Sequence, residues 1–81
     1  MNQKLKDIIM TIYGKNAEIY ESTVLSEDLS FTSIHFVQLI VEIEANFEFE
    51  FSDDELDIVK INCADNLNKI VTEHIRHKES K

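Results

Sequence analysis

The sequence contains no proline, no tryptophan and one glycine, Gly14. Tight turns in β-rich folds depend on glycine, proline and Asn-Gly pairs, so this scarcity argues against a sheet and favours helices. No apolar run is long enough for a signal peptide or a membrane span. The one cysteine, Cys63, excludes an intramolecular disulfide and suits a reducing compartment. We therefore expect an all-α, cytoplasmic protein without membrane insertion.

Basic residues are also scarce, with 8 Lys and Arg against 16 Asp and Glu, which gives a formal net charge of −8. A field of that sign repels nucleic acid and anionic membranes and attracts basic protein surfaces, although acidity can also serve solubility alone. The 81 residues suffice for one small domain, residues 1–81, with little room to build a supporting shell around an active site. We expect a monomer that is not an enzyme and does not bind nucleic acid.

Helical periodicity is clearest near the two ends of the chain. Residues 2–13 predict a helix with one apolar face, and Gly14 follows where a C-terminal stop belongs; the apolar positions are Leu5, Ile8, Ile9 and Ile12. Residues 63–78 predict the last helix, which Asn62 can cap. Its apolar stripe consists of Ala64, Leu67, Ile70, Val71 and Ile75. Both segments should therefore bury one face against the rest of the protein.

The central segment, residues 33–48, predicts a second helix with Thr32 as its N-cap. At about 100° per residue its apolar side chains fall into two nearly opposite stripes. We expect the first stripe to be buried: Phe36, Leu39, Ile40, Ile43 and Phe47. The second stripe is either more core or an exposed docking surface, and periodicity does not decide between them: Ile34, Val37, Val41 and Ala45.

The remaining segments connect these helices. Residues 15–32 lack periodicity, and we expect a long loop that packs on the helices through apolar anchors, with a helical turn near residues 17–21. The run Ser52-Asp53-Asp54-Glu55 has the form of a capping box and predicts a short third helix over residues 53–58. The expected fold is a small four-helix bundle, with three longer helices, one short helix and a long loop between the first two.

The stretch Glu27-Asp28-Leu29-Ser30-Phe31-Thr32-Ser33-Ile34 resembles the attachment motif of the acyl and peptidyl carrier protein family, Asp-Leu-Gly-x-Asp-Ser-Leu. Asp28 and Leu29 match directly, Ser33 stands at the modified serine, and Ile34 replaces the leucine. The family's apolar and acidic pattern continues in register through the second helix and the Ser52 capping box. The resemblance then covers about two-thirds of the chain, and the agreement in layout is more specific than the short motif.

This resemblance implies a free-standing carrier that holds acyl or aminoacyl intermediates as thioesters on a 4'-phosphopantetheine arm. The arm comes from coenzyme A and would be attached to Ser33. A serine at a helix start lies beside free backbone N–H groups, which stabilise a phosphodiester. Because His35 points elsewhere on the helix, it cannot serve as a base for Ser33, and an external phosphopantetheinyl transferase must catalyse the attachment.

The other implied partners are enzymes that load or transfer acyl or aminoacyl groups. The resemblance places their docking surface on the second helix, at Ile34, Val37, Val41, Glu42 and Glu44. Four positions depart from the family: Ser30 replaces a glycine, Thr32 replaces an aspartate that helps the modifying enzyme bind its metal, and His35 and Gln38 replace acids. These departures favour a dedicated fatty acid, polyketide or nonribosomal peptide pathway over general fatty acid synthesis.

Two alternatives remain open. The chain could be an unmodified helical interaction module, a degenerate carrier that only docks. It could also be a small metal-binding regulator, since His74 and His77 are spaced at i, i+3, but no third ligand is evident. The acidic run Asp53, Asp54, Glu55 and Asp57 lacks the glycine and the terminal glutamate of a calcium loop. We therefore expect no metal, and we expect Cys63 to be a small buried residue.

Overall fold

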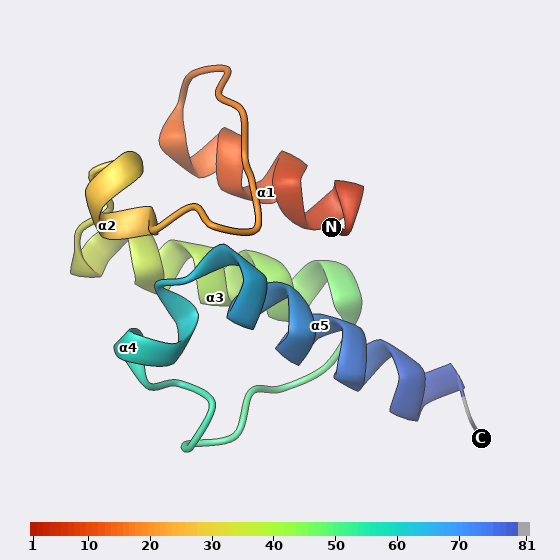
Figure 1. Ribbon diagram of the computed structural model, residues 1–81. Coiled ribbons are helices and arrows are strands. Elements are labelled where there is room, and N and C mark those ends of the chain that lie inside the picture. The colour runs from red at the N-terminus through yellow and green to blue at the C-terminus, as the bar shows by residue number, and fades with distance from the viewer. Residues whose placement is uncertain (80–81) are drawn as a thin grey trace.

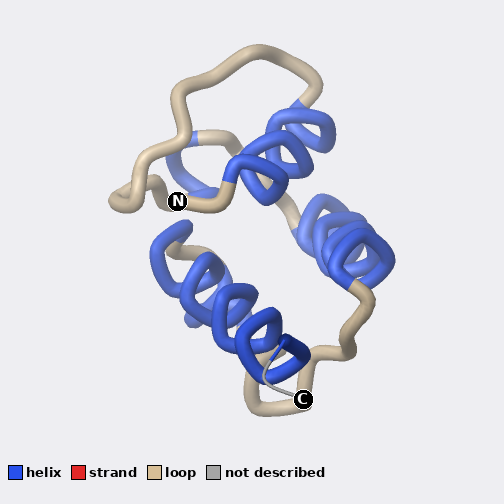
Figure 2. The backbone as a smooth tube through the Cα atoms, turned by 90° about the vertical axis from the view of Figure 1, so that its right-hand side faces the viewer, coloured by secondary structure: helices blue, strands red, loops and turns tan. Residues whose placement is uncertain are grey.

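The computed structural model describes residues 1–79 and is helical, with no strand among those residues (Figure 1). The predicted all-α fold with three longer helices is confirmed. The elements in chain order are α1 (Gln3–Tyr13), α2 (Leu25–Asp28), α3 (Ser33–Phe47), α4 (Ile58–Ile61) and α5 (Ala64–Glu79). Figure 2 shows α1, α3 and α5 arranged around a shared interior, with the loops on the outside. α2 and α4 are single turns.

The ends of α1 are set by the two residues that flank it. The Asn2 side chain accepts the N–H of Leu5 at 3.1 Å, while its own N–H donates to Asn68 Oδ1 of α5 at 3.0 Å. Gly14 ends the helix in the left-handed region, with φ of 84°, and its N–H donates to Met10 O. The predicted stop at Gly14 is confirmed, because only glycine enters this region without a steric cost. Three predicted core residues are buried: Leu5, Ile8 and Ile9.

α3 packs against α1 (Figure 1). The two apolar stripes of α3 lie on opposite faces of the helix, as its periodicity predicts. Phe36, Leu39 and Ile43 are buried, as predicted. Ile40 and Phe47 are only half-buried, so their prediction as core residues was too strong. Both lie at the border of the buried face, and the Lys4 ammonium rests 5.4 Å from the centre of the Phe47 ring. One face of α3 thus supplies the core and leaves the opposite face available.

The long connection between α1 and α3 contains a helical turn at a different place from the one predicted. The turn is α2 rather than residues 17–21, which are not helical. Asp28 closes α2 because its carboxylate accepts the N–H of Val24 at 2.8 Å. Leu25 and Leu29 are buried at its two ends. The local side chain-to-backbone bond and the two apolar anchors explain why the turn forms there.

Asn62 does not cap the last helix as predicted. Its side chain instead exchanges two hydrogen bonds with Ser26, accepting the N–H at 2.8 Å and donating to the hydroxyl at 2.9 Å. The first N–H groups of α5 are satisfied by the loop: Ala64 N–H donates to Thr23 O and Asp65 N–H to Glu21 O. The helix therefore begins at Ala64 rather than Cys63, and Cys63 is half-buried rather than fully buried.

The predicted third helix over residues 53–58 is also wrong in its position. The capping box of Ser52 and Glu55 forms, with Ser52 N–H to Glu55 Oε1 at 2.8 Å and Glu55 N–H to Ser52 Oγ at 3.3 Å. It closes an isolated turn, and α4 starts later, where Asp57 caps Val59 N–H at 2.9 Å. The later start buries Ile61, whose exposed fraction is 2%. Ser52 and Asp57 can each cap a helix start, and burial of Ile61 in the core favours the helix that starts after Asp57.

Ser30 adopts the left-handed region with φ of 57°, the position where the carrier family has glycine. This conformation is unfavourable for a residue with a Cβ atom. We expect Ser30→Gly to raise the free energy of unfolding by about 0.5–1 kcal/mol, since relief of this strain exceeds the added entropy of the unfolded chain. Urea denaturation of both proteins measures the difference.

Ser22 provides the matched control, because it is also an exposed loop serine but does not have a positive φ. Ser22→Gly should leave stability unchanged or lower it slightly. Equal effects of the two glycine substitutions would show that backbone strain at Ser30 does not limit stability.

Candidate functional site

Ser33 is the first residue of α3 and is exposed. The residue two positions before it, Phe31, is buried, and its N–H donates to Leu25 O at 3.1 Å. The Phe31 ring meets the Phe36 ring edge-on, with 5.6 Å between centroids. An apolar anchor on each side of Ser33 thus fixes the backbone, while the serine hydroxyl stays on the surface.

The start of α3 offers hydrogen-bond donors to an anion attached at Ser33. Phe36 N–H donates to Thr32 O at 3.1 Å, and the N–H groups of Ser33 and Ile34 precede this first intrahelical bond, while the His35 N–H faces the Thr32 side chain in a capping box. The partial positive charge of a 15-residue helix adds to these donors. None of residues 29–41 is Asp or Glu, so the sequence neighbours of Ser33 place no carboxylate beside a phosphodiester. The residues present therefore fit a phosphodiester on the serine oxygen.

His35 turns back toward the residue before Ser33. Its Nδ1 accepts the N–H of Thr32 at 2.9 Å and lies 3.0 Å from the Thr32 hydroxyl oxygen. The imidazole also rests on Phe31, with ring centroids 5.2 Å apart. Sequence reasoning excluded His35 as a base but did not identify this contact. The spacing of Thr32 and His35, from N-cap to third helical residue, is that of a capping box and was the available signal.

The second apolar stripe of α3 is exposed, which resolves the question left open by periodicity. The exposed fractions are 71% for Ile34, 64% for Val37 and 57% for Val41. An open groove of about 460 Å³ runs beside them between α1 and α3, lined by Thr11, Ile12, Val37, Gln38, Val41 and Glu42. The long loop buries its own anchors elsewhere and does not cover this stripe. The surface starts at Ser33 and follows α3.

The two acids predicted beside this surface differ in their surroundings. Glu42 is exposed and lines the groove. Glu44 is half-buried, and its carboxylate accepts the N–H of Phe51 at 2.9 Å. Glu42 is therefore available to a partner, whereas Glu44 already stabilises the chain that leaves α3.

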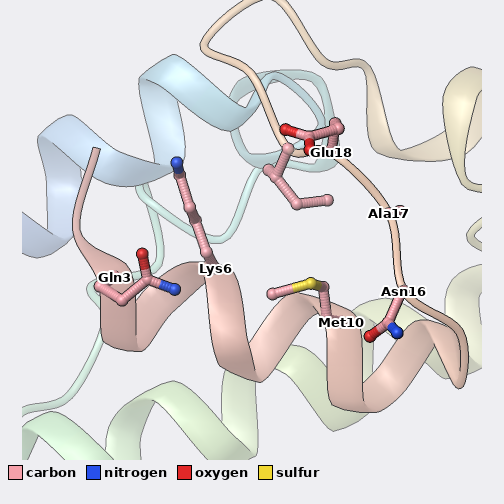
Figure 3. Close-up of a pocket in the computed structure, with 7 residues that line it drawn as sticks. Gln3, Lys6, Met10, Asn16, Ala17 and Glu18 are labelled. Carbon is pink, nitrogen blue, oxygen red and sulfur yellow. The ribbon is translucent and has the colours of Figure 1, made fainter.

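A second hollow lies on another side of α1 and includes none of the predicted site residues (Figure 3). Its volume is about 470 Å³, and it is lined by Gln3, Lys6, Met10, Asn16, Ala17, Glu18 and Ile19. Figure 3 shows Gln3, Lys6 and Met10 along one face of α1, opposite Asn16 and Glu18 of the loop. This hollow is separate from the surface that carries Ser33.

The histidines considered as metal ligands have other contacts. His74 Nε2 lies 2.9 and 3.0 Å from the two carboxylate oxygens of Glu55, and its ring stacks on Phe49 at 4.1 Å. His77 Nε2 lies 3.3 Å from the Glu73 carboxylate. Within residues 1–79, no three His, Cys, Asp or Glu side chains are grouped to bind a metal. The stacked, half-buried His74 was not predicted, because Phe49 and Glu55 are distant from it in sequence.

The Glu55–His74 contact ties the turn before α4 to α5 and should depend on pH. Partial burial raises the pKa of the Glu55 carboxyl, but hydrogen bonds from Ser52 and His74, with the charge of His74, together lower that pKa below its usual value. A carboxyl with a lowered pKa in the folded state stabilises the fold above its unfolded pKa, near 4.3, and loses this contribution as the pH falls further. Glu55→Gln should therefore lower the free energy of unfolding by about 0.5–1 kcal/mol at neutral pH and by less below about pH 3.

Urea denaturation at both pH values measures this difference. Glu73→Gln is the control. The Glu73 side chain is 61% exposed while it pairs with Arg76 and His77 of the same helix, so we expect little change in the free energy of unfolding. A Glu55→Gln deficit of the same size at both pH values would contradict a contribution from the carboxylate charge.

The described residues contain no helix with both the length and the apolar character needed to cross a membrane.

Comparison with known proteins identifies a matching family model and a similar protein. The family model described as "Phosphopantetheine attachment site" matches residues 3–67. An acyl carrier protein from Coprothermobacter proteolyticus is 37% identical over 59 residues, which cover 72% of this chain and 72% of that protein. No solved structure matches the chain. The family match includes the whole of α3 and the Ser33 region that precedes the exposed stripe.

Proposed function

Since this chain belongs to the phosphopantetheine-attachment family of carrier proteins, we propose that it carries acyl or aminoacyl groups and that Ser33 bears the arm. Its cofactor is covalently attached 4'-phosphopantetheine, whose terminal thiol carries the cargo as a thioester. The observation that carries the assignment to Ser33 is its exposed position at the start of α3, next to the buried Phe31. A hydroxyl there is accessible to an enzyme, and the helix start favours the negative charge of the product.

Ser33 provides the nucleophilic oxygen of the attachment reaction. Its Oγ forms a bond to the phosphorus that carries the pantetheine of coenzyme A, and the bond to the adenosine bisphosphate leaving group breaks. The hydroxyl proton passes to a base of the transferase, because the Nδ1 of His35 is already occupied by Thr32. The product phosphodiester then lies beside the N–H groups of the first turn of α3.

We propose that the transferase and the loading and transferring enzymes dock on Ile34, Val37 and Val41. Exposed apolar side chains with a polar border are typical of interface centres. Glu42 lines the adjoining groove and would form part of the rim. Glu44 is part of the same proposed surface, although its carboxylate also accepts the Phe51 N–H.

The wider assignment is to a dedicated fatty acid, polyketide or nonribosomal peptide pathway. It is supported by the departures at Ser30, Thr32, His35 and Gln38. The last three replace acids and make the surface around Ser33 less acidic than in the general family pattern. We propose a cytoplasmic, monomeric carrier of one domain over residues 1–81 that is not itself an enzyme. Its chemistry would come from its partners and from the thiol of the arm.

Co-expression with a phosphopantetheinyl transferase tests this function. Intact-mass spectrometry should show the addition of one phosphopantetheine group. Acyl transfer to the holo protein should then add a second mass that neutral hydroxylamine removes, as expected for a thioester. A protein that stays unmodified with several transferases of different specificity would instead be a module that only docks.

A further inference from the structure

The two residues before Ser33 are held by hydrogen bonds on both sides. Phe31 N–H donates to Leu25 O at 3.1 Å, and Thr32 O accepts Phe36 N–H at 3.1 Å. The remaining backbone donor, Thr32 N–H, donates to His35 Nδ1 at 2.9 Å. Thr32 is exposed, so without His35 this N–H would face water. His35 thus makes the bond that completes the anchoring of the backbone directly before the acceptor serine.

Ser30, which precedes Phe31 and Thr32, makes these hydrogen bonds more important. Ser30 has a φ of 57°, which is unfavourable for serine, so the local sequence alone does not favour this turn. Such a conformation persists when the surrounding contacts determine it. The ring of His35 adds to these contacts, because it rests on the buried Phe31 at 5.2 Å. The imidazole therefore joins the strained turn to the first turn of α3.

We propose that His35 is a positioning residue for the transfer of phosphopantetheine to Ser33. By binding Thr32 N–H, it keeps the Ser33 backbone in one conformation before the transferase binds. A segment ordered in advance loses less conformational entropy when an enzyme binds it. This inference rests on the proposed function, since it requires Ser33 to be the acceptor, and it assigns His35 no contact with the reacting atoms.

Two substitutions separate the hydrogen bond from the ring packing. His35→Phe keeps a ring that can rest on Phe31 but removes the acceptor for Thr32 N–H. His35→Gln loses the ring but keeps an acceptor at the third helical position, where glutamine is a usual capping-box residue. Thr72→Ala is the control, because Thr72 is an exposed polar residue of α5 that belongs neither to the cap nor to the proposed docking surface.

The measurements are the KM and kcat of a purified transferase for each apo protein, with coenzyme A as donor, and the hydrogen exchange of Thr32 N–H by NMR. We expect His35→Phe to raise KM about two- to tenfold, as for the loss of one hydrogen bond, with kcat nearly unchanged. Thr32 N–H should exchange faster in the same variant. His35→Gln should restore both values, and Thr72→Ala should change neither.

Each outcome decides the proposal. Faster Thr32 exchange in His35→Phe without a change in KM would overturn the positioning role. If His35→Gln protects Thr32 N–H but leaves KM high, His35 acts instead through direct contact with the enzyme, and the proposal is equally wrong. Failure of the proposed function is distinct, because wild-type protein would then gain no phosphopantetheine at all.

Discussion

Ser33→Ala is expected to abolish phosphopantetheine attachment completely while leaving the fold intact. Removing the hydroxyl removes the only atom of this residue that can form the phosphodiester. The side chain is exposed, and the start of α3 is held by Thr32, His35 and Phe36 rather than by Ser33, so helix content should not change. Intact-mass spectrometry after co-expression with a transferase measures the loss, and circular dichroism measures the helix content.

Ser30 supplies the control, because it is the other exposed serine of the motif. It lies three residues before α3 and does not share the N–H groups of the helix start. Ser30→Ala should therefore still accept the arm, and peptide mapping of the wild-type protein should find it on Ser33. An adduct that survives in Ser33→Ala, or that maps to Ser30, would refute the assignment.

Ile43→Ala is expected to cost about 2–5 kcal/mol of unfolding free energy, as for other large-to-small changes in a core. Ile43 lies on the inner face of α3, has no exposed surface and belongs to the same cluster as Leu5, Ile61 and Leu67. Truncation leaves a cavity where segments from both ends of the chain meet α3. In a domain of this size the melting temperature should fall by roughly 10 °C or more.

Val41→Ala is the matched control, because it removes methyl groups from the opposite, exposed face of the same helix. Its stability should change by less than about 0.5 kcal/mol. Thermal unfolding followed by circular dichroism compares the two variants. Equal losses would mean that the Val41 face is covered in solution, which would also remove the support for docking at that surface.

The long helices could be predicted from sequence because their signals are local. In α1, the apolar spacing of Leu5, Ile8 and Ile9 coincides with a cap at Asn2 and a stop at Gly14, so the same signals set the helix and its ends. The short elements could not be placed in this way. Ser52 and Asp57 are both good caps, and the choice depends on burying Ile61, which is a property of the assembled core.

In the candidate site, too, some features follow from local sequence signals and others do not. The position of Ser33 at a helix start follows from the motif and from the apolar pattern after it. The exposure of Val37 and Val41 does not follow from periodicity, because two opposite stripes are consistent with a buried or a free face. It was predicted from the family resemblance and is confirmed. The contact of His35 with Thr32 was missed because histidine is not a usual residue at the third position of a capping box. Asn62 was misassigned because its partner, Ser26, lies 36 residues away.

The backbone bonds between the loop and the start of α5 have a consequence for the order of folding. The N–H groups of Ala64 and Asp65 donate to the carbonyls of Thr23 and Glu21. At the same junction the Cys63 thiol donates to the Glu21 carbonyl, which lies 42 residues away in sequence. Closing a chain of that length costs entropy before the bonds at its ends form. The last helix therefore cannot be completed early and independently, and it should acquire its first turn together with the loop. Ser33 lies within this closed segment, so its backbone should become ordered in the same cooperative step as the core.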